Sequence, residues 1–218
     1  MRPVIIRAAA LTTRDVVGGL LLAAAAGGAI DALGAPLPVF PRRTLSVAMA
    51  MAVLFQAMNL WGRDMTRLAG QPGVGAISRR GALFLAVLFG TIGLVLGVTE
   101  PFVVGRAALR GMQIHEVYVL LFVTATLLVA TAGTFTLGRG LYGNRFAARL
   151  GIGSGIAAAA AFLAVALTMD AIGWRVGAPD AARRATMVVV TTLGLIAAGI
   201  AAGAVVGIML FQTQQVRR

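Results

Sequence analysis

The ionisable residues best suited to do chemistry are the single histidine and two glutamates near it. His115 directly precedes Glu116, and Glu100 lies a short distance upstream. An imidazole changes charge near neutral pH, and a neighbouring carboxylate moves that change. The three residues could therefore form a cluster that responds to protons or cations. A structural alternative is that Glu116 stabilises a helix N-terminus while Arg106 and Arg110 neutralise the acids.

Two further carboxylates, Asp31 and Asp170, stand at the ends of apolar segments. Ionisable groups inside a bilayer are costly, so each is a candidate for function by default. Helical spacing places Asp31 on the same face as Gly27, and Glu100 on the same face as Gly97. We therefore expect Asp31 and Glu100 to point into a helix bundle.

An amide pair, Gln56 and Asn59, lies three residues apart in a third apolar segment. This spacing places both side chains on one helix face. They could line the inner half of a path for a solute, or they could form hydrogen bonds between helices, as amides often do in membranes.

Several kinds of chemistry are excluded by the residues present. The chain has no Cys, so disulfides, thiolate metal sites and Cys nucleophiles are excluded. Ser154 stands between Gly153 and Gly155, as in intramembrane serine proteases. Such a protease needs a base on a neighbouring helix, and we expect the only histidine at the opposite membrane face. We therefore interpret Ser154 as part of a small-residue helix start. Met49 and Met51 are better explained as packing residues than as copper ligands. We expect no enzymatic activity, no metal and no cofactor.

The elements that must position these residues are apolar helices. A bilayer core needs about 20 apolar residues per helix. Six runs of about that length occur, and they predict an all-α, polytopic transmembrane bundle: about 16–33, 45–61, 81–99, 117–137, 150–169 and 187–211. We expect loops of about 10 to 20 residues between them, too short for a soluble domain, so that residues 1–218 form a single integral membrane domain.

Composition supports the same class. The 218 residues are 59% hydrophobic and only 12% charged, and the mean hydropathy is +0.92. An ordinary soluble domain is about 25% charged. The formal net charge is +12, but the basic residues separate apolar runs and form no soluble patch, so nucleic acid is excluded as the leading partner.

The basic residues, all of them Arg, also predict the orientation. Cytoplasmic loops carry the excess of positive charge, so we expect both termini inside. The arginines then expected in the cytoplasm outnumber the others: Arg2, Arg7, Arg14, Arg63, Arg67, Arg79, Arg80, Arg139, Arg145, Arg149, Arg217 and Arg218. Most acids then lie toward the outer side and form an acidic vestibule. As an alternative, the first apolar run could be a cleaved signal peptide, which would leave five helices.

Glycines at helical spacing predict where helices pack. Small residues let helix backbones approach closely in lipid. Two stripes stand out: Gly90, Gly93 and Gly97 in the third run, and Gly199, Gly203 and Gly207 in the sixth. We expect a partner helix from the same chain on such a face, although a second protomer is an open alternative.

These patterns leave two functions open. The first is a transporter or channel for an ion or small solute, with a path lined by Gln56, Asn59, Asp31 and Glu100. The alternative is a non-catalytic subunit or assembly partner of a larger membrane complex, which docks through glycine-rich faces. The expected partners are the lipid bilayer and either other membrane subunits or further copies of the chain. Arg without Lys, with abundant Ala and Gly, favours a prokaryotic cytoplasmic (inner) membrane.

Overall fold

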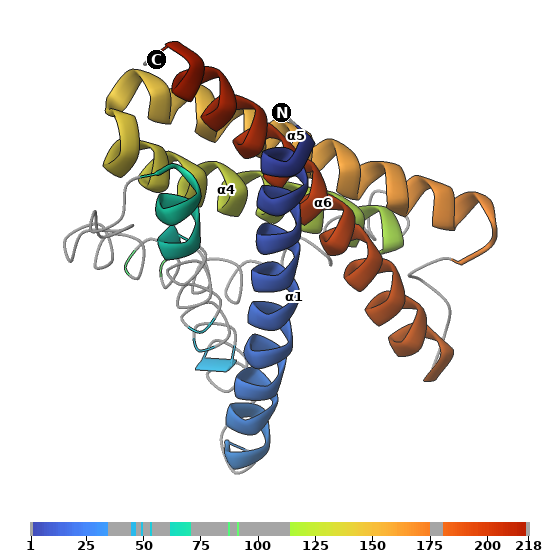
Figure 1. Ribbon diagram of the computed structural model, residues 1–218. Coiled ribbons are helices and arrows are strands. Elements are labelled where there is room, and N and C mark those ends of the chain that lie inside the picture. Colours follow the sequence, from blue (N-terminus) through green and yellow to red (C-terminus); the bar gives the residue numbers. More distant parts are fainter. Residues whose placement is uncertain are drawn as a thin grey trace.

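The computed structural model of the chain describes residues 2–34, 45–46, 49, 53, 62–70, 87, 91, 114–174 and 181–216, and within these it is helical, with no strand. Its four long helices are α1 (Arg2–Leu33), α4 (Ile114–Tyr142), α5 (Asn144–Ala171) and α6 (Ala181–Val216) (Figure 1). A short helical segment, 62–68, ends in a turn at Ala69 and Gly70.

Local sequence explains where these helices begin and end. Pro3 lies in the first turn of α1, where its missing N–H costs nothing. Helix α5 ends in a turn in which Gly173 has a φ of 84° and Trp174 donates a backbone hydrogen bond to Met169. Such left-handed glycines commonly terminate helices because they carry no Cβ.

The helices are longer than the apolar runs that predict them. Helix α1 begins at Arg2 rather than near residue 16, because backbone hydrogen bonding continues through the polar residues before the apolar run. The expectation of a loop of ten residues or more between the fourth and fifth runs is wrong, since only Gly143 separates α4 from α5. The expected runs 45–61 and 81–99 lie mostly outside the described residues.

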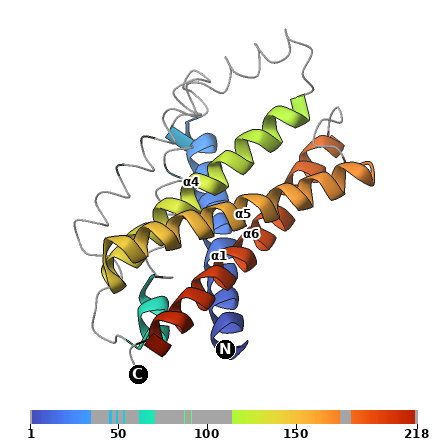
Figure 2. The same cartoon turned by 90° about the horizontal axis from the view of Figure 1, so that it is seen from above.

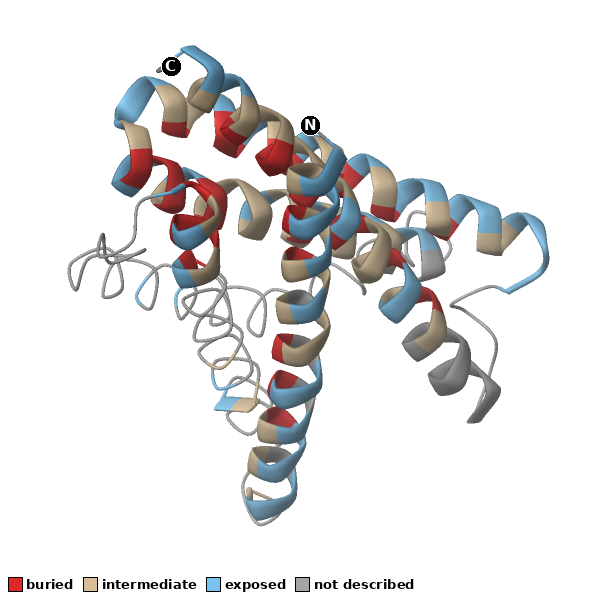
Figure 3. Cartoon of the chain, in the orientation of Figure 1, coloured by how far each residue is buried: buried red, intermediate tan, exposed pale blue. Residues whose placement is uncertain are grey.

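Among the described helices, α4, α5 and α6 pack side by side, and α1 crosses α6 (Figure 2). The connection at Gly143 makes α4 and α5 an antiparallel hairpin, in which Phe122 stacks on Phe162 with ring centroids 6.0 Å apart. Helix α1 packs on α6 with its N-terminal half, while its C-terminal half projects away from α4 and α5 (Figure 1). Buried positions gather where the helices cross, and the outer faces are exposed (Figure 3).

The start of α1, segment 62–70, the α4–α5 turn and the end of α6 meet at one end of the bundle. The hydroxyl of Tyr142 donates a hydrogen bond to the carbonyl oxygen of Ala69 at 3.4 Å. The amide of Gln214 donates one to the carbonyl oxygen of Leu68 at 3.3 Å. We call this the arginine-rich end, because exposed arginines occur in three of these segments: Arg2, Arg7, Arg63, Arg67, Arg139, Arg145 and Arg149.

Four stretches of the described helices are long and apolar enough to cross a membrane: Arg2–Ile30, Val119–Tyr142, Asn144–Ala171 and Val189–Val216. An all-helical arrangement with four such stretches fits an α-helical membrane protein.

Candidate functional site

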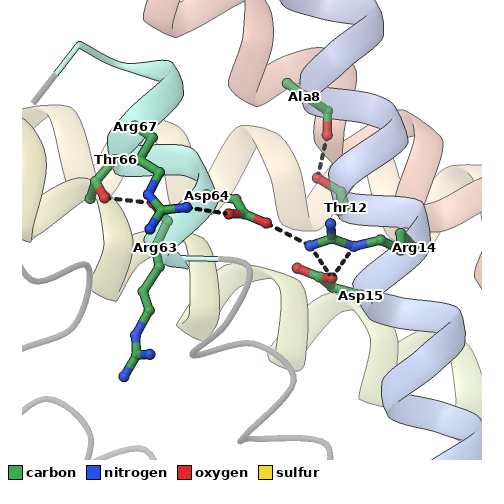
Figure 4. A network of polar contacts seen from close by, with 8 residues as sticks. All are labelled: Ala8, Thr12, Arg14, Asp15, Arg63, Asp64, Thr66 and Arg67. Atoms are coloured by element: carbon green, nitrogen blue, oxygen red, sulfur yellow. Dashed lines mark hydrogen bonds and ion pairs between the residues drawn. The ribbon is translucent and has the colours of Figure 1, made fainter. Parts of the chain in front are cut away.

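A network of charged side chains joins α1 to segment 62–70 (Figure 4). The Arg14 guanidinium donates hydrogen bonds to Asp64 Oδ2 at 2.6 Å and to Asp15 Oδ1 at 2.7 Å. On the far side, Arg67 Nη1 lies 3.8 Å from Asp64 Oδ1. The short distances to Arg14 are those of charge-assisted bonds, which are stronger than neutral ones. The network therefore ties together two segments that are 50 residues apart in sequence.

Local backbone bonds hold the α1 side of this network in place. The hydroxyls of Thr12 and Thr13 each donate to the carbonyl oxygen four residues earlier, at 2.8 Å. This leaves no hydroxyl donor unsatisfied beside the charged residues, as a low-dielectric environment requires. Arg14 and Asp15 can then extend from the helix toward the neighbouring segment.

The partner side is held at the arginine-rich end of the bundle. Met65 is fully buried and packs in a cluster with residues of α1, α4, α5 and α6. Thr66 donates to the carbonyl oxygen of Arg63 at 2.8 Å. The hydroxyl of Ser46, which precedes segment 62–70 in the sequence, donates a hydrogen bond to the carbonyl oxygen of Gly27 at 2.7 Å. Residues Ser46 and Asp64 thus contact α1 in antiparallel order.

The packing of α1 on α6 sets the level of the network along the bundle. Gly207 faces Ile5, Gly203 faces Ala9, and Gly199 faces Thr13. Gly199 is near the middle of the apolar stretch Val189–Val216. Arg14 and Asp15, which follow Thr13, therefore stand beside the central part of α6 rather than beside either of its ends.

Burial differs sharply within the network. The Arg14 side chain is 58% exposed and that of Asp64 is 27% exposed, whereas that of Asp15 is only 11% exposed. The second oxygen of Asp15, Oδ2, is buried and has no hydrogen-bond partner. A buried carboxylate oxygen in this condition carries a desolvation cost.

The candidate residues predicted from the sequence are only partly described. Gln56, Asn59 and Glu100 lie outside the described residues, as do Gly90, Gly93 and Gly97. Asp31 lies in the last turn of α1, in the half that projects away from α4 and α5 (Figure 1).

His115 and Glu116 lie in the first turn of α4, and Asp170 lies in the last turn of α5. The antiparallel register of the hairpin brings these three positions to the same end, opposite the Gly143 turn. Glu116 is exposed, and a carboxylate in a first turn interacts favourably with the helix dipole. Both the cluster interpretation and the structural alternative for these residues stay predictions.

The glycine stripe of α6 lies against α1. A Cβ on Gly203 would come within 2.8 Å of the carbonyl oxygen of Ala8, and one on Gly207 would come within 2.6 Å of the Cα of Ile5. Only glycine lets these backbones approach so closely. A second close approach joins α4 and α5, where Gly151 and Gly155 meet the backbone of Thr131 and Leu127.

Ser154 lies inside α5 rather than at a helix start, because α5 begins at Asn144. Its side chain is fully buried and its Oγ has no hydrogen-bond partner. The neighbouring residues Gly151 and Gly155 contact α4 near Thr131, several helical turns from His115. The histidine that a serine protease would need therefore lies far from Ser154.

Within the described part of the chain, no three His, Cys, Asp or Glu side chains are grouped closely enough to hold a metal ion. Arg14 and its two carboxylates form the candidate site that sequence reasoning missed. Its only signal in the sequence is that Asp15 and Asp64 each stand beside an Arg.

The chain matches no protein-family model, no curated protein and no solved structure.

Proposed function

We propose that this protein is a small transporter or channel for an ion or small solute, and that the contact between Arg14 and Asp64 closes its path where α1 meets segment 62–70, between the middle of α6 and the arginine-rich end. This end would face the cytoplasm of a prokaryotic cell, with the carboxylates of the opposite end forming an outer vestibule. Both termini would lie inside, with six helices in the complete bundle.

The observation that carries the proposal is the charged network beside the central part of α6. If α6 crosses the bilayer, Arg14 and Asp15 lie well inside the apolar layer. Charged groups at that depth nearly always face a bundle interior or a water-filled cavity, because lipid would penalise them. Since Arg14 is more than half exposed, its surroundings must supply water, and a water-accessible path between α1 and segment 62–70 would do so.

The alternative is a non-catalytic subunit that docks through glycine-rich faces. The described glycine faces of α5 and α6 are already covered by α4 and α1 of the same chain. Docking would therefore need other surfaces, and for this reason we favour transport.

The test uses the purified chain in liposomes that contain a pH-sensitive dye, with imposed gradients of protons, Na⁺ or K⁺ as probes. We expect the wild-type protein to dissipate at least one gradient faster than protein-free vesicles. Asp64→Asn removes one charge of the closing contact and should raise the leak about two- to fivefold, since an ion pair with this exposure contributes up to about 1 kcal/mol. Asp64→Glu keeps the charge and is the matched control.

A wild-type protein that moves none of the three probes contradicts the transport proposal. An Asp64→Asn variant with the same leak as Asp64→Glu contradicts the closing role of the contact between Arg14 and Asp64. A chain that aggregates unless partner chains are present supports the subunit alternative. Glu100→Gln in the same assay tests the outer cluster, because unchanged flux at every pH would remove that cluster from consideration.

A further inference from the structure

The α4–α5 turn carries three arginines that the fold leaves exposed. Arg139 lies in the last turn of α4, and Arg145 and Arg149 lie in the first turns of α5. We call these three residues the turn arginines. Arg14 and Arg67 contact carboxylates, but no such contact joins the turn arginines to a carboxylate in the described part of the chain.

The positions of these charges are unfavourable for the isolated fold. Arg145 and Arg149 are four residues apart, on one helix face, where like charges destabilise a helix. Arg145 also lies in a first helical turn, where the helix dipole is positive and disfavours a cation. An external anion at this turn would relieve both effects.

The surroundings of the turn indicate where that anion comes from. The apolar stretches Val119–Tyr142 and Asn144–Ala171 meet at Gly143, so the turn lies where two candidate spans leave the bilayer. Tyr142 and Phe146 form an edge-to-face pair there, with ring centroids 4.9 Å apart. Tyr is enriched at the level of lipid headgroups, with its ring in the apolar layer and its hydroxyl in a polar one.

We propose that the turn arginines form a binding surface for the phosphate of an anionic phospholipid headgroup. A guanidinium matches phosphate geometry with two parallel hydrogen bonds, and basic residues at the membrane surface attract anionic lipids. The surface is separate from the Arg14 network, so it stands whether or not the chain transports anything.

The proposal is tested with the full chain in detergent micelles that contain equal amounts of phosphatidylglycerol and phosphatidylcholine. The protein is repurified, and its retained lipids are identified by mass spectrometry. We expect the wild type to retain phosphatidylglycerol over phosphatidylcholine by about threefold or more, with the preference falling as NaCl is raised, as a surface charge interaction requires. Arg145→Gln/Arg149→Gln should abolish the preference.

The matched control is Arg2→Gln/Arg7→Gln, which removes two exposed charges from α1 and should keep the preference. Circular dichroism and size-exclusion chromatography check that each variant folds, and the salt titration on the wild type tests the proposal without any variant. Absence of a preference in the wild type, or equal loss in both double variants, overturns it. Binding of inorganic phosphate with no preference between the two lipids also overturns it, because the source would then be the free ion.

Discussion

At the scale of single residues, Gly203 tests how closely α1 and α6 pack. A Cβ at this position would meet the Cα and backbone nitrogen of Ala9 and the carbonyl oxygen of Ala8, and a backbone cannot move aside as a flexible side chain can. We expect Gly203→Ala to lower stability by about 1–3 kcal/mol, the usual cost of overpacking. Unfolding in a denaturing detergent, followed by circular dichroism, measures this.

Gly18→Ala is the matched control, because a Cβ at Gly18 would meet nothing within 4 Å. It should leave stability unchanged or raise it slightly, since Ala favours helix over Gly by about 1 kcal/mol. Equal losses in the two variants would mean that the α1–α6 contact is not tight.

Residues differ in how far their sequence alone discloses their role. The spacing of Gly199, Gly203 and Gly207 is visible in the sequence because one helix contains all three. The contact between Arg14 and Asp64 is not visible, because it joins residues 50 positions apart and depends on the path of the chain between them. Spacing rules work within one element, whereas a site made by two elements needs their relative placement.

At the scale of elements, the α4–α5 turn depends on one glycine. Gly143 has a φ of 85° and a ψ of −176°. This region of backbone space is essentially restricted to glycine, and other residues pay about 1–3 kcal/mol to adopt it. We expect Gly143→Ala to lower the stability of the hairpin by that amount in the same unfolding assay. Asn144→Ala, one residue further on in regular helix, should have little effect, and a similar loss there would contradict the explanation.

Helix class was predictable from hydropathy, but helix length was not. An apolar run marks the part of a helix that lipid can cover, whereas the helix itself continues for as long as backbone hydrogen bonds can form. This is why α1 extends to Arg2 and why α4 and α5 approach within one residue of each other. A search for apolar runs assigns the charged ends, such as Arg139 and Arg145, to loops although both are helical.

At the scale of the whole molecule, the separation of charge along the bundle carries the prediction of orientation. The arginine-rich end joins the α4–α5 turn and the end of α6, which lie together in Figures 1 and 2, and the start of α1 packs into the same buried cluster through Ala8. Glu116 and Asp170 lie at the other end of the α4–α5 hairpin. Because cytoplasmic segments carry excess Arg, this end should face the cytoplasm, and the hairpin should cross the bilayer twice.

Single introduced cysteines can test this orientation cleanly, because the natural chain has none. Asn144→Cys and Gln215→Cys place a thiol at exposed positions of the arginine-rich end, and Trp174→Cys places one beyond α5, where the side chain is 48% exposed. In intact cells, we expect a membrane-impermeant maleimide to label Trp174→Cys and neither of the other two. After the cells are opened, all three should react.

Labelling of Asn144→Cys in intact cells would reverse the orientation, and labelling of all three in intact cells would mean that the hairpin does not cross the membrane. The first outcome would also move the proposed closing contact at Arg14 to the outer side, since the helices that position it are fixed to the same end.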